Sequence, residues 1–107
     1  EAKLSYDMNV KPSKNSRPIP LYRLFLKWAV ANKVDGIIVG ATFPKIIKNC
    51  KNTTGKKLDI YSPGVGTQGG DAKKAISNGS NFIIVGRTIL NSKDPVYVAK
   101  QLQLACI

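Results

Sequence analysis

Three short apolar runs recur along the chain at an even spacing. They begin near residues 36, 59 and 82, and the tetrapeptide IIVG occurs in the first run and again in the third. Each run is rich in β-branched residues and ends in glycine with small or polar neighbours, which is typical of buried strands. The repeat of about 23 residues predicts three strands. The segment KLSYDMNV near the start is interpreted as a further strand.

A helical pattern follows each predicted strand. The predicted helices cover residues 20–33, 44–50, 71–78 and 94–105. Apolar residues at helical spacing share one face of the first helix: Leu21, Leu24, Phe25, Trp28 and Ala31. The last helix has an expected buried stripe of Val98, Ala99 and Leu102. Asp71 and Asp94 are the expected N-caps, and Gly55 and Gly79 the expected helix ends.

Strict alternation of strand and helix predicts parallel strands joined by helical crossovers. Eight units of this length would form a (β/α)₈ barrel of roughly 200 residues, but the 107 residues hold about four. We therefore expect residues 1–107 to form a single half-barrel segment, with a small doubly wound open sheet as the competing architecture. The barrel-facing side chains of Ile38, Tyr61 and Ile84 would then be exposed, and the chain would associate in solution.

Composition narrows the possible functions. The net charge is +11, and residues 1–57 carry 12 of the 17 lysines and arginines. These residues are scattered and show no nucleic-acid-binding motif, so a solvated surface is the expected role; a nucleic acid or an acidic partner is the alternative. No apolar run is long enough to span a membrane. Because the first residue is not methionine, Glu1 is expected to mark a point where a longer chain was cut or the residue left after removal of a starting methionine.

The two cysteines, Cys50 and Cys106, are far apart, and the sequence contains no histidine. This combination excludes a Cys/His zinc site and any mechanism that uses an imidazole base. Buried free thiols are expected instead, as in proteins of the reducing cytoplasm.

The segment SPGVGTQGGD, residues 62–71, is the strongest candidate for a binding site. Gly64, Gly66 and Gly69 match the dinucleotide pattern G-x-G-x-x-G. That pattern also requires an acidic residue at the end of the next strand, where this chain has Gly86 and Arg87 instead. A P-loop is excluded as well, because Gly70 and Asp71 stand where lysine and a hydroxyl residue are needed.

A single phosphate group fits this segment better than a dinucleotide. Glycines allow backbone amides to approach an anion closely, and the Gln68 side chain adds a further donor. Arg87, after the next strand, supplies a charge-assisted contact. The segment TILNS is expected to form a short extra turn before the last helix. A phosphate site between the last two loops is common in (β/α)₈ enzymes.

SPGVGTQGGD, followed 11 residues later by FIIVGRTI, closely resembles the C-terminal signature of orotidine 5′-monophosphate decarboxylase. DGIIVGAT and LSYDMNV also fall where that family has its sixth and fifth strands, so the resemblance covers nearly the whole chain. It implies strands five to eight of a (β/α)₈ barrel. It also implies a cytoplasmic enzyme of pyrimidine biosynthesis, usually a homodimer, that converts OMP to UMP and CO₂ without cofactor or metal.

The resemblance also implies roles for individual residues. Gln68, Gly86 and Arg87 would hold the 5′-phosphate, and Asn9 lies near the position of a family serine that hydrogen-bonds the pyrimidine. The wall around phosphate and base would be formed by Pro63, Gly64, Val65, Gly66, Thr67, Gln68, Gly69 and Gly70.

The family's catalytic motif, D-x-K-x-x-D, is missing from this sequence. The nearest match, beginning at Asp71, lacks the second aspartate and opens a helix. We therefore expect no catalytic residue in this chain, no activity from it alone, and a partner that is either the N-terminal half of the enzyme or another copy. A stand-alone phosphate-binding half-barrel is the alternative function, and sugar-phosphate decarboxylases of the same superfamily remain open.

Overall fold

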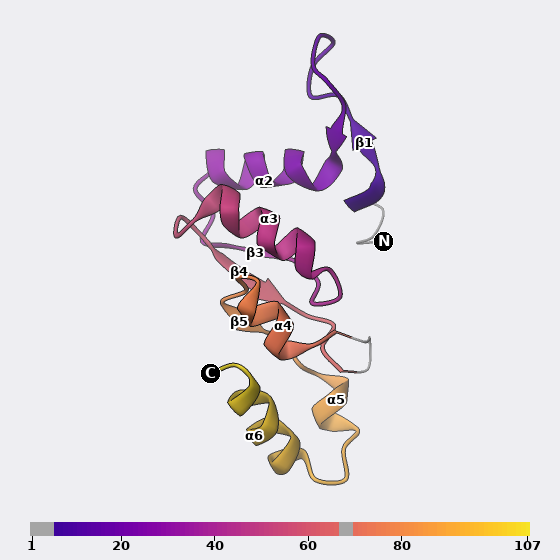
Figure 1. Cartoon of the computed structure of the whole chain (residues 1–107), viewed down its shortest axis with the longest axis vertical. Coiled ribbons are helices and arrows are strands. Elements are labelled where there is room, and N and C mark those ends of the chain that lie inside the picture. Colours follow the sequence, from indigo (N-terminus) through magenta and orange to yellow (C-terminus); the bar gives the residue numbers. More distant parts are fainter. Residues whose placement is uncertain (1–5, 67–69) are drawn as a thin grey trace.

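The computed structural model describes residues 6–66 and 70–107 and shows an elongated molecule (Figure 1). Its principal extents are 55 × 26 × 19 Å, and its radius of gyration is 15.3 Å. A compact chain of this length would have a radius of gyration of about 13 Å. The helices and strands are therefore laid out in a row instead of closing around a centre.

Three parallel strands form the sheet, in the order β3-β4-β5. They are β3 (Gly36–Ile38), β4 (Asp59–Ser62) and β5 (Phe82–Ile83), which confirms the three starting positions given by the sequence repeat. Gly36 pairs with Asp59, but Phe82 pairs with Tyr61, two residues further along β4. Such a stagger between neighbouring strands is what closure of a barrel requires.

The segment near the start does not add a fourth parallel strand to this sheet. Tyr6 and Asp7 are helical, and β1 (Asn9–Val10) pairs antiparallel with β2 (Ile19–Pro20). The predicted first strand is therefore present only at Asn9 and Val10, where it belongs to a hairpin and not to the parallel sheet. Closing a hairpin across the polar loop 11–18 brings together residues close in sequence, which costs less chain entropy than pairing with β3.

Besides the helical residues Tyr6 and Asp7, the described part of the chain contains five helices: α2 (Leu21–Ala31), α3 (Pro44–Thr54), α4 (Ala72–Ser77), α5 (Arg87–Leu90) and α6 (Pro95–Ala105). Asp71 and Asp94 cap α4 and α6 as predicted, each accepting a backbone N–H bond of 3.0 Å. Gly55 ends α3, and α5 is the expected extra turn. None of the described helices is long and apolar enough to cross a lipid bilayer.

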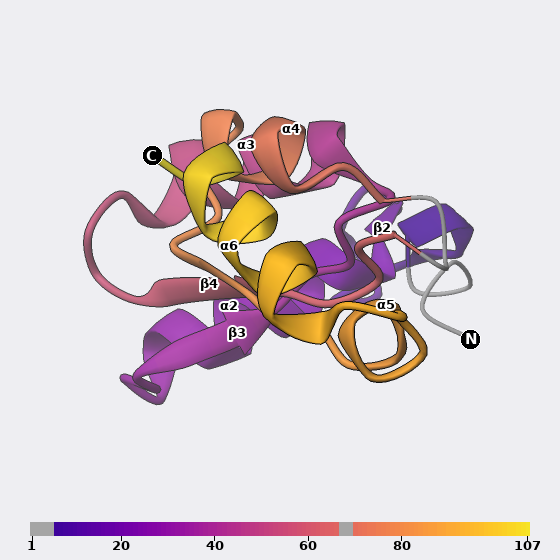
Figure 2. The same cartoon turned by 90° about the horizontal axis from the view of Figure 1, so that it is seen from below.

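The core lies between the sheet and its helices. Figure 2 shows α3 and α4 on the same side of the sheet. Ile47 from α3, Ile60 from β4 and Ala75 from α4 are completely buried there. Cys50 joins this core, and burial raises the pKa of its thiol to about 11. Cys106 is half-buried, so the two cysteines are free thiols with different degrees of protection.

Helix α2 packs with a different face from the one predicted. Tyr22 and Leu26 are buried, whereas Phe25 and Trp28 are 45% and 53% exposed. The two exposed rings contact each other, with centroids 5.5 Å apart. The helix carries two apolar stripes, and periodicity alone could not tell which one faces the sheet.

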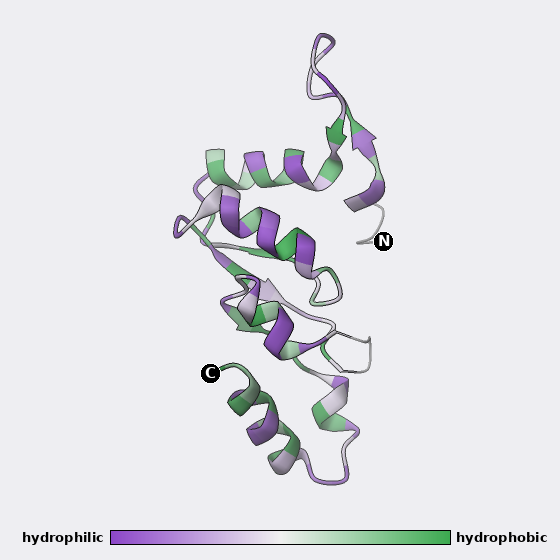
Figure 3. Cartoon of the chain, viewed as in Figure 1, coloured by the Kyte–Doolittle hydropathy of each residue, from purple (hydrophilic) through white to green (hydrophobic). Residues whose placement is uncertain are grey.

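Helix α6 is only loosely covered, although Figure 3 shows it as largely hydrophobic. None of its residues is fully buried. Val98 and Leu102 of the predicted stripe are half-buried, and Ala99 is exposed. The predicted buried stripe is therefore not confirmed, because α6 has too few packing partners in the described chain to bury it.

The opposite face of the sheet is open, as the half-barrel interpretation predicts. Ile38, Tyr61 and Ile84 are 70%, 36% and 46% exposed. Phe82 is half-exposed and stacks on Tyr61 with ring centroids 5.0 Å apart. Among the described residues, the outer edges of β3 and β5 have no pairing strand. Contiguous apolar surface and free edges of this kind promote association.

We expect the chain to self-associate at micromolar concentration, and Ile38→Lys/Ile84→Lys to reduce that association by placing charge on the open face. Light scattering measures both. Leu104→Lys is the matched control, because Leu104 is 61% exposed on α6, away from this face. A monomeric wild-type chain would contradict the expected association through the open face.

Candidate functional site

The candidate site lies where β4 and β5 end. These parallel strands end at the same edge of the sheet, and residues 63–70 follow β4 while Gly86 and Arg87 follow β5. In (β/α)₈ proteins this carboxyl end carries the binding loops. The sheet therefore directs both predicted phosphate-binding segments to one end of the molecule.

The glycine-rich loop is closed by its own backbone. The Gly70 amide donates to the Gly64 carbonyl over 2.9 Å, and the Gly66 amide donates to the Gly70 carbonyl over 3.0 Å. The Ala41 amide anchors the loop's start through the Pro63 carbonyl at 2.7 Å. The amides of Gly66 and Gly70 are thus already engaged, contrary to the expectation that successive amides of this loop point at an anion.

Thr67, Gln68 and Gly69 lie outside the described residues. Their predicted contacts with a phosphate stay predictions.

Glycine occupies these positions of the site for different physical reasons. Gly66 has φ +80°, a conformation that other residues rarely adopt. A Cβ at Gly70 would collide with the Gly64 carbonyl oxygen, so a side chain cannot fit there. A Cβ at Gly86, in contrast, would meet no described atom within 4 Å. Packing within the described chain therefore does not demand glycine at position 86, and the space beside it is open to a ligand.

Arg87 begins α5 with an exposed side chain. Within residues 6–66 and 70–107 its guanidinium forms neither an ion pair nor a hydrogen bond. The next residue, Thr88, donates its hydroxyl to the Val65 carbonyl over 3.0 Å. The glycine-rich loop and the segment that carries Arg87 are therefore in direct contact.

Two residues near this end of the sheet were missed by the sequence interpretation. Thr88 is one, because a contact across 23 residues leaves no local signal. Tyr6 is the other: its hydroxyl accepts the Gly40 amide at 3.3 Å, and its ring lies 4.5 Å from that of Phe43. Burial raises the pKa of Tyr6, so the phenol is neutral and can serve as both donor and acceptor.

Asn9, the predicted pyrimidine contact, occupies a different kind of position. It lies exposed in β1, paired with Pro20, and not at the end of a strand of the parallel sheet. The structure thus corrects its setting, while its role stays a prediction. Asp71, rejected as a catalytic residue, accepts the Lys74 amide as the cap of α4.

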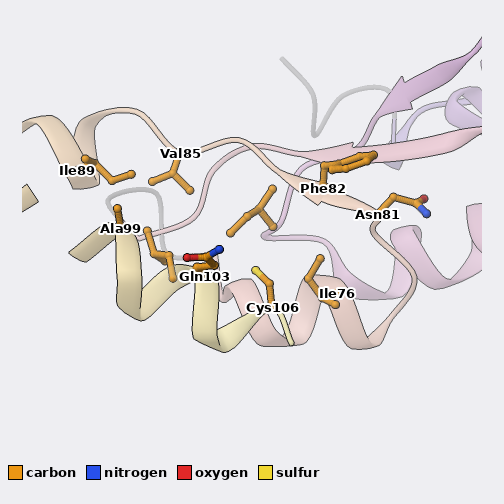
Figure 4. Close-up of a pocket in the computed structure, with 10 residues that line it drawn as sticks. Ile76, Asn81, Phe82, Val85, Ile89, Ala99, Gln103 and Cys106 are labelled. Atoms are coloured by element: carbon orange, nitrogen blue, oxygen red, sulfur yellow. The ribbon is translucent and has the colours of Figure 1, made fainter. Parts of the chain in front are cut away.

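An apolar groove lies away from this site, between α6 and the layer formed by β5 and α4. Figure 4 shows Val85 and Phe82 along the upper side and Ala99, Gln103 and Cys106 along the lower side, with Ile76 of α4 next to Cys106. Its lining is predominantly hydrophobic and offers no charged group. The groove therefore does not suit a phosphorylated ligand. It lies along the face of α6 that packs only loosely against the rest of the chain.

Comparison with known proteins decides the family. The model of the orotidine 5′-phosphate decarboxylase / HUMPS family matches residues 5–102. The chain belongs to this family. The orotidine 5′-phosphate decarboxylase of Methanococcoides burtonii is 42% identical over 74 residues, which cover 69% of this chain and 34% of that enzyme.

Solved structures of orotidine 5′-phosphate decarboxylases show the same arrangement. The enzyme from Pyrococcus horikoshii matches with a TM-score of 0.73 and 34% identity, over 81% of this chain and 42% of that one. The enzyme from Methanocaldococcus jannaschii, complexed with inhibitor BMP, gives 0.72 and 31%, over 81% and 41%. These matches confirm the predicted fold class, the C-terminal half of a (β/α)₈ barrel. The chain thus spans well under half the length of these relatives.

Replacing Asp71 should affect stability, because it caps a helix. We expect Asp71→Ala to lower the free energy of unfolding by about 1 kcal/mol and Asp71→Asn to retain most of it, since asparagine also caps helices. Urea denaturation measures the change. Equal stability of wild type and Asp71→Ala would show that the cap is not formed.

Proposed function

We propose that this chain forms the substrate-phosphate site of an orotidine 5′-phosphate decarboxylase, which converts OMP to UMP and CO₂ in pyrimidine biosynthesis. The observation that carries the proposal is the 3.0 Å bond between Thr88 and Val65, because it joins the glycine-rich loop to the segment of Arg87. Family membership supports the substrate class. The free thiols, one of them buried, fit a cytoplasmic location.

In this proposal the Arg87 guanidinium and the Gln68 side-chain amide both donate hydrogen bonds to the phosphate. Arg87 is exposed and has no side-chain partner among the described residues, so both arms of its planar fork can face phosphate oxygens. The amides of Gly66 and Gly70 are used inside the loop, so backbone donors would come from residues 67–69 and from Gly86. Pro63 and Val65 contribute to the wall beside the base.

Binding of the phosphate contributes to catalysis even though the phosphate is far from the reacting carbon. Binding energy from a remote group can hold the reacting centre in the geometry that the transition state needs. This chain carries no D-x-K-x-x-D motif, so the groups that act on the carboxylate would have to come from another segment. We propose that the N-terminal half of the enzyme supplies them.

Three features support such a partner. The chain covers only 34% of the M. burtonii enzyme, the outer strand edges are unpaired in the described sheet, and its barrel-facing side is apolar and exposed. The groove along α6 and the exposed rings of Phe25 and Trp28 extend this unpacked surface to the helix layer. A second copy of the chain is the competing occupant.

A stand-alone phosphate-binding half-barrel is the second candidate function. It is favoured by the fact that the loop 63–70 and Arg87 both lie within these 107 residues. The two candidates share the phosphate site and differ in whether a catalytic half completes the enzyme.

Arg87→Ala should weaken UMP binding by on the order of ten- to a hundredfold, the range expected for hydrogen bonds to a charged group. Isothermal titration calorimetry with UMP and with inorganic phosphate measures it. Arg17→Ala is the matched control, since Arg17 is an exposed arginine in the loop between β1 and β2. Unchanged affinity of Arg87→Ala would place the site elsewhere.

The chain alone should not convert OMP to UMP, because it lacks the groups that act on the carboxylate. Mixing it with a polypeptide that carries the D-x-K-x-x-D half should restore conversion, followed by chromatography of OMP and UMP. UMP formation by the isolated chain would overturn the assignment of the chemistry to another segment. Phosphate binding without any restored activity would favour the stand-alone module.

A further inference from the structure

Thr88 makes a close two-part contact with the glycine-rich loop. Its hydroxyl donates to the Val65 carbonyl over 3.0 Å. Gly66 packs directly against the same side chain, because a Cβ at Gly66 would collide with Thr88 Oγ1 and stand 2.8 Å from Cγ2. Both branches of the Thr88 side chain therefore make contacts: the hydroxyl donates to a carbonyl, and the methyl group packs against Gly66.

This contact differs from those that shape the loop internally. The bonds between Gly64, Gly66 and Gly70 set the curvature of the loop, and the bond from Ala41 to Pro63 ties its start to the segment that follows β3. The contact of Thr88 joins the loop after β4 to the turn after β5. Because Thr88 directly follows Arg87 in the sequence, this contact sets the distance between the glycine-rich loop and Arg87. A β-branched residue suits this task, because its side chain has few rotamers.

We propose that Thr88 is a positioning residue for phosphate binding. It holds the glycine-rich loop at a fixed separation from Arg87, so that groups on both segments reach the same phosphoryl group. Thr88 itself need not touch the ligand. The inference rests on the proposed function, because it assumes that these two segments bind one phosphate.

The test compares UMP affinity of the wild-type chain with that of Thr88→Val, Thr88→Ala and Thr88→Ser, by calorimetry. Valine keeps the shape and loses the hydroxyl, so affinity should fall roughly three- to tenfold, as expected for one lost hydrogen bond. Alanine should lose at least as much, and serine, which keeps the hydroxyl, should recover most of the loss. Thr88→Ala also serves as the second variant if valine does not fold.

Thr53→Val is the matched control. Thr53 is exposed in α3, and its hydroxyl likewise donates to a backbone carbonyl, that of Asn49, at 3.0 Å. A purely structural role for Thr88 predicts that both valine variants change the unfolding midpoint and neither changes affinity. A positioning role predicts that only Thr88→Val loses affinity.

The outcomes separate the two proposals. If Arg87→Ala loses UMP affinity while Thr88→Val and Thr88→Ala bind as the wild type does, the positioning role is wrong and the phosphate site stands. If Arg87→Ala binds as tightly as the wild type, or the wild-type chain binds neither UMP nor phosphate, the proposed function fails and the role of Thr88 fails with it.

Discussion

The bond from the Thr88 hydroxyl to the Val65 carbonyl is the interaction on which the proposed site depends. It connects the loop after β4 to the turn after β5, and these are the two segments that the phosphate would have to bridge. Parallel pairing of β4 with β5 brings their ends to one edge of the sheet, but pairing alone does not fix how two loops stand relative to each other. A side-chain contact between the loops supplies that constraint.

In the described part of the chain, the sheet is covered by helices on one face only, and its other face is open. Between sheet and helices, Ile47, Ile60 and Ala75 are fully buried, so this layer can hold the strand ends in place. On the other side, Ile38 is 70% exposed and Phe82 half-exposed. In the proposed function, the helix layer organises the end of the sheet that would bind phosphate, and a partner would cover the side that would face the barrel interior.

Much of this architecture was predictable from sequence because it is locally encoded. The period of the apolar runs located all three parallel strands, and the caps Asp71 and Asp94 were visible as acidic residues before helical segments. The motif around the glycines and Arg87 identified the family, which the comparisons confirmed. These features depend on neighbours in sequence or on a shared signature.

The features that escaped prediction depend on competition between alternatives. Helix α2 carries two apolar stripes, and only packing shows that Leu26 faces the core while Trp28 faces outward. The segment before the hairpin is helical at Tyr6 and pairs locally at Asn9, where a strand of the sheet was expected. Thr88 had no signal at all, because its importance arises from a contact between distant segments.

The glycines of the site also include features that the sequence did not predict. The sequence suggested that all of them make room for an anion. The structure gives Gly66 and Gly70 a role in the loop's own closure, through a left-handed backbone and a close carbonyl contact. Gly86 has no such demand from the described chain, which leaves room beside it for the phosphate of the proposed function.

The most direct test of the central claim is a titration of the ¹⁵N-labelled chain with UMP, followed by amide chemical shifts, with uridine as the comparison that lacks phosphate. If one phosphoryl group is held by both segments, the amides of residues 64–70 and those of Gly86 and Arg87 shift together with a single dissociation constant, and uridine leaves them in place. Shifts confined to one of the two segments, or equal shifts with uridine, would contradict the account.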